Sequence, residues 1–197
     1  MAASQQFSES QSAFNVTDRF PISPLIRITL MALYAVLMAP LPVLAGVSQY
    51  GGSPVWLTAG IGLGAIGLYG ALAQVVKTND QGIEVTYPGW FRWIYRGGWQ
   101  LRWDDVTALK PRTTGQGGIV YYFVGKDQQA YLLPMRIAGF ARLVRQVQAK
   151  TGIDTQDVKP LAQPWMYGIL LGLTMLLGLV DVWTITTAIQ LDGTLVP

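Results

Sequence analysis

Three long apolar blocks dominate the pattern of hydrophobic and polar positions along the chain. They cover residues 22–46, 54–76 and 164–189, and the only charged residues inside them are Arg27 and Asp181. Each block reaches the ~20 residues that a helix needs to cross ~30 Å of hydrocarbon. A segment in lipid must also satisfy its own backbone hydrogen bonds, which favours helices. The pattern therefore predicts three transmembrane helices, the first with a bend or its outer end at Pro40 and Pro42.

A different pattern covers residues 77–152, between the second and third blocks. Apolar and polar positions alternate over 82–87, as in a half-buried strand. Further strands are predicted at 106–109, 119–124 and 130–133. A helix over 138–150 then places four apolar residues on one stripe. These are Phe140, Leu143, Val144 and Val147. The segment is predicted to be a small β-rich domain closed by an amphipathic helix.

The run from residue 90 to 103 combines aromatic and basic residues. Gly97-Gly98 divides it, and this pair predicts a two-residue hairpin turn that places Trp93 opposite Arg102. Such Arg–Trp pairs allow cation–π contacts of ~0.5–1 kcal/mol. One face of the hairpin is then a candidate contact surface for a partner or for lipid headgroups, and packing within the core and the interface is the alternative. The candidate contact residues are Trp90, Arg92, Trp93, Tyr95, Arg96 and Arg102.

Charge predicts the orientation of the chain in the membrane. Residues 77–159 hold twelve of the fourteen lysines and arginines, whereas the loop at 47–53 holds none. The positive-inside rule therefore predicts that the β-rich domain is cytoplasmic. Residues 1–21 are predicted to be a disordered cytoplasmic tail, 153–163 a linker, and 190–197 a short tail on the outer side.

Composition narrows the function classes. Hydrophobic residues make up 51% of the chain, charged residues only 13%, and the mean hydropathy is +0.32, as in integral membrane proteins. Cysteine and histidine are absent, which excludes disulfides, thiol chemistry, histidine bases and the usual zinc, haem and iron–sulfur ligands. We therefore expect a protein that is not an enzyme and has no cofactor, metal site or nucleic-acid partner.

Short motifs in this order resemble a known family. They are Asp80-x-Gly82-Ile83-x-Val85, then Trp103-x-x-Val106-x-x-Leu109, then Tyr131-x-Leu133-Pro134. Two preceding transmembrane helices and a closing helix complete the resemblance to bacterial pleckstrin-homology-like (PH-like) membrane proteins. It implies a half-open β-barrel capped by its C-terminal helix. The chain departs from the family in its third span, and its predicted strands fall short of the seven in a full domain.

A second resemblance is to the photosystem I assembly factor of cyanobacteria and chloroplasts, which has two N-terminal spans and a stromal domain. It rests on Phe91-Arg92-Trp93 and on the corner at Asp105-Val106. It implies a role in assembly in a thylakoid or plasma membrane of a cyanobacterium. We therefore expect a membrane-anchored scaffold that docks on a larger membrane-protein complex. The alternatives are a protein that binds anionic lipid headgroups and, third, a transporter subunit or membrane enzyme.

Two features inside the spans leave alternatives open. Gly60, Gly64 and Gly67 share one face of the second span, and Gly168 and Gly172 lie in the third. Small residues allow close helix contact in lipid, either within this chain, with a partner, or with a second copy. Asp181 either extends to the outer interface beside Trp183 or takes part in ion or proton handling.

Overall fold

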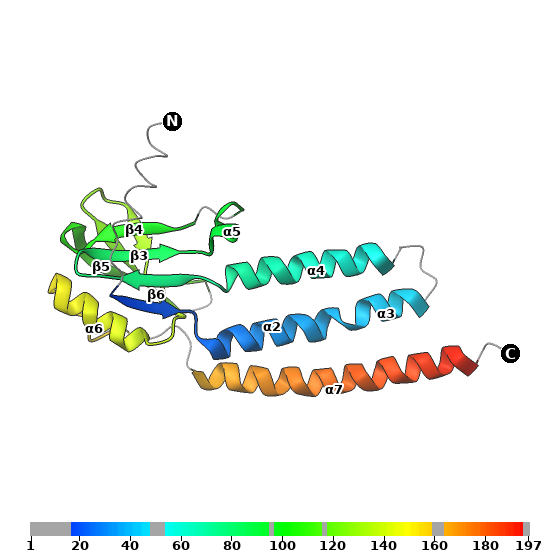
Figure 1. Ribbon diagram of the computed structural model, residues 1–197. Helices are drawn as coiled ribbons and strands as arrows, with labels where there is room; N and C mark the ends of the chain where they lie inside the picture. Colours follow the sequence, from blue (N-terminus) through cyan, green and yellow to red (C-terminus); the bar gives the residue numbers. More distant parts are fainter. Residues whose placement is uncertain (1–16, 48–53, 95–96, 116–117, 159–163, 195–197) are drawn as a thin grey trace. The chain divides into compact units, whose positions relative to one another are not determined.

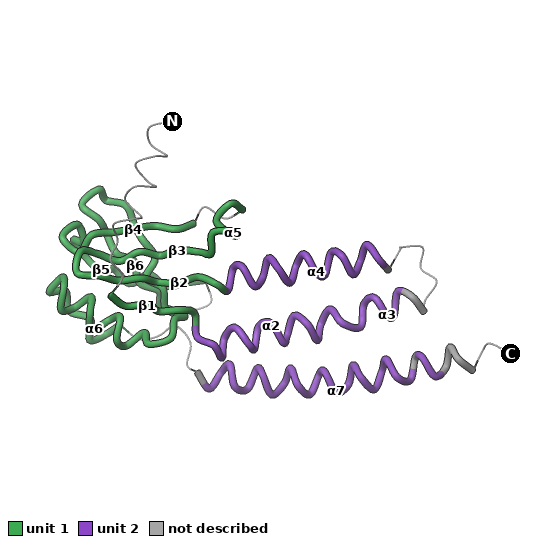
Figure 2. The backbone as a smooth tube through the Cα atoms, in the orientation of Figure 1, with its two compact units in different colours: residues 1–22, 73–161 green, residues 23–72, 162–197 purple. Residues whose placement is uncertain are grey.

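The computed structural model describes residues 17–47, 54–94, 97–115, 118–158 and 164–194. The chain divides into two compact units, which Figure 2 colours separately. One unit comprises residues 1–22 and 73–161 and is rich in strands. The other comprises residues 23–72 and 162–197 and is helical. Residues 23–72 are therefore inserted into the chain of the β-rich unit, between its first and second strands.

Consecutive antiparallel strands build the β-rich unit (Figure 1). One sheet has the order β1-β2-β3-β4 and the other the order β5-β6-β7. The strands are β1 (Asp18–Pro21), β2 (Val75–Thr78), β3 (Gly82–Thr86), β4 (Trp99–Arg102), β5 (Val106–Thr113), β6 (Ile119–Gly125) and β7 (Ala130–Leu132). A short 3-10 helix, Trp103–Asp105, joins the two sheets. The predicted β-rich region is thus confirmed, and its described part holds seven strands.

Side chains from both sheets and one helix form the core of this unit. Phe20, Ile83, Phe123 and Leu133 are at most 1% exposed. Helix α6 (Phe140–Thr151) closes the unit with the predicted apolar stripe, all of whose members are buried. Gly152 ends the helix at a φ of +70°, the left-handed conformation that glycine adopts most readily.

Strand β1 corrects the predicted disordered tail. Residues 18–21 pair with β2 in the register Asp18↔Thr78 to Pro21↔Val75, and the Phe20 side chain is fully buried. The Arg142 guanidinium lies 3.3 Å from the Asp18 carboxylate, and the Gln146 amide also donates to that carboxylate. The burial of Phe20 and the polar contacts between Asp18 and α6 stabilise a strand here, although the composition of the segment is polar. The rest of the predicted tail, residues 1–16, lies outside the described residues.

The predicted hairpin at 90–103 is wrong. Residues Gly89–Arg92 form a helical turn, α5, and β4 pairs with β3 in the register Val85↔Trp99 to Gly82↔Arg102. Pro88 directs the chain into α5, and Phe91 is buried, so this half of the run is anchored as a helix. Trp93 therefore does not face Arg102.

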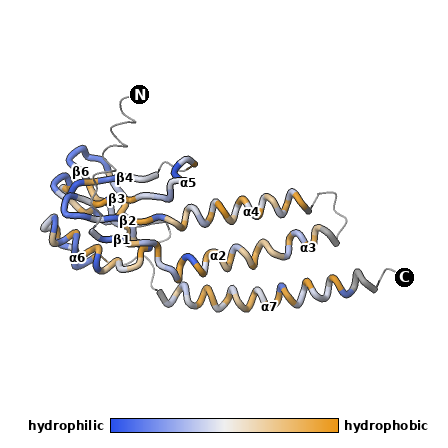
Figure 3. Tube along the Cα trace, viewed as in Figure 1, coloured by the Kyte–Doolittle hydropathy of each residue, from blue (hydrophilic) through white to orange (hydrophobic). Residues whose placement is uncertain are grey.

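The helical unit contains α2 (Pro24–Met38), α3 (Pro40–Val47), α4 (Pro54–Ala71) and α7 (Pro164–Thr194). Two helices are long and apolar enough to cross a membrane, over Pro24–Ala45 and Trp165–Thr187, and the apolar part of α4 is shorter. Figure 3 shows the apolar residues along these helices. Within the unit, α2 and α3 pack on both α4 and α7 and lie between them (Figure 1).

The first span is interrupted where two prolines follow each other closely. Helix α2 ends at Met38, the Ala39 amide donates to the Ala35 carbonyl, and α3 begins at Pro40. Proline has no amide hydrogen, so Pro40 and Pro42 cannot donate to the carbonyl four residues earlier. The carbonyls of Val36 and Met38 therefore lack their usual helical donors. The predicted bend lies at this position.

Candidate interaction surface

A cluster of exposed apolar side chains lies on and just after α5. Trp90 is 48% exposed, Trp93 86% and Ile94 68%. Among the described residues of the β-rich unit, the other large exposed apolar side chains are Ile119 and Leu132, on the second sheet. We call the side chains of Trp90, Trp93 and Ile94 the α5 surface. Of the features of this unit, this surface is the one that core packing explains least.

Phe91 anchors the α5 turn to the unit. Its side chain is only 7% exposed, and its ring centre lies 6.0 Å from that of Tyr87 and 5.5 Å from that of Trp90. The amides of Phe91 and Arg92 both donate to the Pro88 carbonyl, at 2.9 and 3.0 Å. Because the turn is held from inside, its outward side chains are presented in a defined position.

The strand register shows that this surface lies at one end of the strands of the first sheet. Pro21 pairs with Val75, Val75 pairs with Thr86, and α5 begins three residues after Thr86. Pro21 also lies three residues before α2 begins, and Val75 four residues after α4 ends. The α5 surface thus follows the end of β3 that lies beside Pro21 and Val75.

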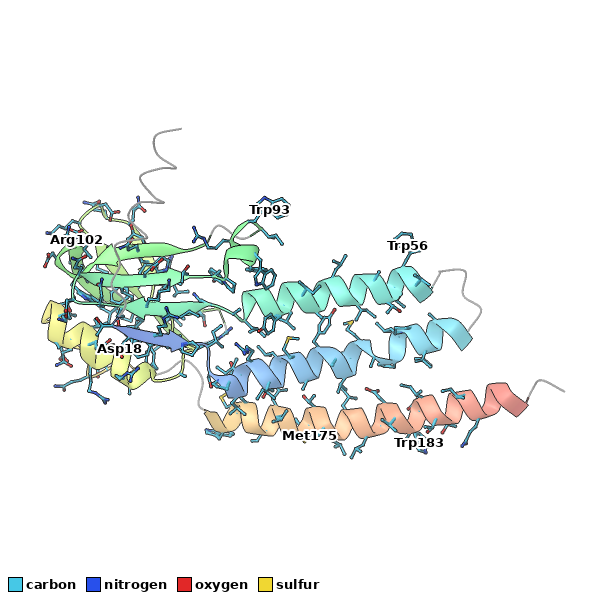
Figure 4. All side chains as sticks on the ribbon, viewed as in Figure 1. Asp18, Trp56, Trp93, Arg102, Met175 and Trp183 are labelled. Atoms are coloured by element: carbon cyan, nitrogen blue, oxygen red, sulfur yellow. The ribbon has the colours of Figure 1, made fainter. Side chains whose placement is uncertain are left out.

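The six predicted contact residues do not form one surface. Trp90, Arg92 and Trp93 lie together on α5 or next to it, and the Arg92 side chain is exposed. Arg102 pairs with Gly82 at the other end of β4, and its guanidinium lies 3.7 Å from the Asp104 carboxylate. Figure 4 shows Trp93 and Arg102 at opposite ends of the unit. Tyr95 and Arg96 lie outside the described residues.

Ile94 and the anchor Phe91 were not predicted as members of the site. Helical spacing was the available signal, because Tyr87 and Phe91 are four residues apart and Trp90 and Trp93 three apart. The Gly97-Gly98 turn signal favoured a strand through the same residues. The α5 surface therefore differs from the predicted one in both its members and its secondary structure.

Several charged or titratable groups of the β-rich unit lie in pairs. Glu84 is buried on β3, with its carboxylate 3.7 Å from the Lys77 ammonium of the neighbouring strand. A hydrogen bond from Lys150, together with its charge, holds the pKa of the Asp80 carboxyl below the ordinary value of 3.8. Burial and a hydrogen bond to Asp127 raise the pKa of Tyr131 above its ordinary 10.0. These pairs stabilise the fold around the surface.

No set of metal ligands accompanies the surface. The described residues contain no group of three or more histidine, cysteine, aspartate or glutamate side chains that could hold a metal ion. The arrangement offers apolar area and one arginine, which suits the binding of a protein or a lipid interface more than chemistry on a small substrate.

The glycines of the spans differ in what surrounds them. A Cβ atom on Gly64 would collide with the Tyr34 hydroxyl, which donates a 2.7 Å hydrogen bond to the Ile61 carbonyl. A Cβ atom on Gly60, Gly67, Gly168 or Gly172 would meet nothing within 4 Å. Gly178, which the sequence analysis did not select, faces Val36, whose Cγ2 would lie 3.3 Å from an added Cβ. Its spacing of four residues from Thr174 was the available signal.

Asp181 lies on the face of α7 that packs within the helical unit. Its Oδ2 atom is buried and has no hydrogen-bond partner among the described residues. Trp183, two residues later, is 69% exposed. The Oδ2 atom is thus shielded by the helical unit, whereas the Trp183 side chain is exposed.

Comparison with known proteins places the chain among relatives. No family model matches it, and no solved structure matches it. Over 163 residues it is 56% identical to a protein of Synechocystis described as "Uncharacterized protein slr0269", an alignment that covers 81% of each chain. Identity at this level over most of both sequences shows common descent, and the chain belongs to the same family as this Synechocystis protein.

Proposed function

We propose that this chain is a non-enzymatic membrane-anchored adaptor whose β-rich unit docks on a larger membrane-protein complex through the α5 surface. The carrying observation is the 86% exposure of Trp93, beside Trp90 and Ile94, on a turn whose position is set by the buried Phe91. Monomeric soluble proteins rarely leave contiguous apolar clusters uncovered, and exposed clusters mark interaction sites. Tryptophan is also the residue most enriched at binding hot spots.

Three spans anchor the adaptor in this proposal. Strands β1 and β2 pair with each other, so both lie on one side of the membrane. The chain between them includes the candidate span Pro24–Ala45, and a single crossing would separate the strands. The 18 residues of α4 extend ~27 Å at 1.5 Å per residue, enough for the return crossing. Helix α7 is the third span, and the basic β-rich unit is cytoplasmic.

The β-rich unit is a PH-like domain in this proposal. Four strands in one antiparallel sheet, three in the other, and a closing helix with a buried stripe support it. Two of the seven strands were missing from the sequence analysis: β1 comes from before the first span, and β2 begins at Val75, inside the segment predicted as the end of the second span. The resemblance to PH-like domains implies no catalytic residue, which agrees with docking through α5.

The complex is part of photosystem assembly, and the membrane is the thylakoid. Support comes from the family relation to a Synechocystis protein and from the local resemblance to the photosystem I assembly factor. The test of this proposal therefore identifies the partner itself.

Purification of tagged full-length protein from cyanobacterial membranes in a mild detergent tests the docking role. We expect photosystem I subunits in stoichiometric amounts with the wild-type protein, and loss of them with a Trp90→Ala/Trp93→Ala double variant. Arg102→Ala, at the other end of β4, and Ile119→Ala, an exposed apolar residue of the second sheet, are the matched controls and should retain the complex. Equal recovery with all variants would remove the α5 surface from the docking role.

A bilayer interface is the second candidate partner of the same surface. Tryptophan rings prefer the depth of the headgroups, and Arg92 beside them would gain ~1 kcal/mol from an anionic leaflet. Full-length protein in nanodiscs with and without phosphatidylglycerol distinguishes this function. A blue shift of tryptophan fluorescence that requires the anionic lipid, is lost in the double variant, and occurs without co-purified protein would replace docking by headgroup binding.

A further inference from the structure

A positive charge lies at the contact between α2 and α4. The Cζ atom of the Arg27 guanidinium is 5.4 Å from the centre of the Tyr69 ring. Seven residues further along α2, the Tyr34 hydroxyl donates a 2.7 Å hydrogen bond to the Ile61 carbonyl, which lies eight residues before Tyr69 on α4. The two helices therefore pack antiparallel. Because residues seven apart share one face of a helix, Arg27 lies on the face of α2 that meets α4.

Arg27 lies at the end of the helical unit where the candidate spans begin. Thr29, in the second turn of α2, donates to the carbonyl of Tyr167, in the first turn of α7, at 3.4 Å. Helices α2 and α7 thus begin at the same end, and both candidate spans begin there too. Trp165, which is 60% exposed, lies at the start of α7. Tyrosine and tryptophan rings gather at the headgroup level of a membrane, so this end carries the residues of an interface.

The chain supplies no counter-charge for Arg27 at this end. Among the described residues, its guanidinium has no ion pair and no hydrogen bond. The first turns of α2 and α7 contain no acidic residue. The acids of the helical unit, Asp181 and Asp192, lie ~21 Å or more beyond Tyr167 along α7. The guanidinium, which has five N–H donors, therefore lies against an aromatic ring without an anion.

We propose that Arg27 and Tyr69 form a binding site for the phosphate group of an anionic phospholipid, at the end of the contact between α2 and α4. The planar guanidinium can bind two phosphate oxygens at once. The face of the Tyr69 ring holds the guanidinium in position and leaves its N–H edge for the phosphate. A lipid with a net negative charge neutralises Arg27, whereas a zwitterionic lipid brings a cation of its own.

This inference rests on the proposal that the helical unit spans a membrane, and it is independent of the α5 surface. Extraction of cyanobacterial membranes with alkaline carbonate tests the anchoring by itself. Release of the protein would refute both the spans and the lipid site. Retention of the protein, with no lipid preference in the experiment below, would refute the lipid site alone.

Native mass spectrometry of the full-length protein tests the site. The protein is mixed in a mild detergent with equal amounts of phosphatidylglycerol and phosphatidylcholine that have the same acyl chains. The wild-type protein should retain phosphatidylglycerol about fivefold more often. Arg27→Gln should remove this preference, and Arg27→Lys, which keeps the charge but loses the planar fork, should keep part of it. Arg145→Gln is the control, because Arg145 is an exposed arginine of α6, and it should keep the full preference.

Variants of the ring separate loss of the site from loss of the fold. Tyr69→Phe keeps the ring and should keep the preference, whereas Tyr69→Leu frees the guanidinium and should lower it. Far-UV circular dichroism checks that each variant keeps its helices, and Arg27→Lys decides the test if Arg27→Gln does not fold. Equal retention of the two lipids by the wild-type protein, or an unchanged preference in Arg27→Gln, would overturn the proposal. Displacement of the lipid by excess inorganic phosphate would overturn it as well, because the site would then bind a soluble anion.

Discussion

The two units of this chain bury their apolar residues in opposite ways. In the β-rich unit, Phe20, Ile83 and Phe123 are fully buried. In the helical unit only 6% of each candidate span is buried, and large side chains such as Leu63 and Leu179 are about 70% exposed. The first unit completes its core from its own residues. The second leaves most of its apolar side chains outside any core of its own, a pattern typical of helices that cross a membrane.

The largest effect is expected from opening the self-contained core. Phe20→Ala removes a fully buried ring from β1, beside the Arg142 guanidinium that lies 4.8 Å from the ring centre. It should lower the free energy of unfolding of the β-rich unit by about 3–5 kcal/mol. Urea unfolding of the full-length protein in detergent, followed by near-UV circular dichroism, measures this.

Trp93→Ala is the control for this prediction, because it removes a larger aromatic side chain that is 86% exposed. Its effect should stay within about 0.5 kcal/mol. Equal effects of the two variants would show that β1 is not part of the core. The contrast between a β-rich unit that buries its own apolar residues and a helical unit that does not would then be weaker.

A smaller effect is expected in the helical unit, where packing is confined to a few close contacts. Gly178→Leu places a side chain where even a Cβ atom lies 3.3 Å from Val36, and should weaken the contact between α2 and α7 by about 1–3 kcal/mol. Gly172→Leu should change little, because nothing lies within 4 Å of its Cβ position. Unfolding by sodium dodecyl sulfate titration compares them, and equal loss of stability would mean that α7 packs through another face.

A single buried hydrogen bond gives the next effect. The Trp103 indole donates to the Asn79 carbonyl at 2.9 Å, and Trp103 is only 5% exposed. Trp103→Phe leaves that buried carbonyl without its donor and should cost about 1–3 kcal/mol in the same urea assay. Trp99→Phe removes a similar part of a ring that packs on Phe123 and Tyr131, and should cost less. The reverse order would show that ring volume outweighs the hydrogen bond.

Periodicity predicted α6 because its burial is one-sided: the apolar stripe of this helix is the set of positions that the structure buries. The alternation over β3 also located a strand, although Glu84, between Ile83 and Val85, is buried as well. Strand β1 was missed because it is only four residues long and is joined to its partner across two spans. Its stability comes from Phe20 and from α6, and neither contact is local.

Only part of the candidate site was predicted from the sequence. Exposure of Trp90 and Trp93 follows from a run with more aromatic residues than the core can bury. Their secondary structure does not follow, because Gly97-Gly98 signals a hairpin and Pro88 signals a helix start, and only the buried position of Phe91 decides between them. The contact of Gly178 with Val36 and the burial of Asp181 depend on which helix neighbours α7, and the spacing of small residues along α7 does not identify that helix.

The smallest expected effect concerns a titrating group at the surface of the β-rich unit. Burial, and then the hydrogen bond and charge of Asp127, raise the pKa of the Tyr131 hydroxyl above 10.0. Its contribution to stability is therefore fully present below pH 10 and is lost as the pH rises through the folded-state value, because the unfolded chain gives up the proton first. Wild-type stability should fall more steeply above pH 10 than that of Tyr131→Phe, which has no hydroxyl to titrate. Phenolate absorbance of the folded protein provides the second measurement, since the difference between the two proteins isolates one tyrosine that ionises above the ordinary range. Parallel stability curves, with a Tyr131 that ionises at the ordinary pKa, would contradict this prediction. They would show that the Tyr131 hydroxyl, at the edge of the second sheet, is open to solvent.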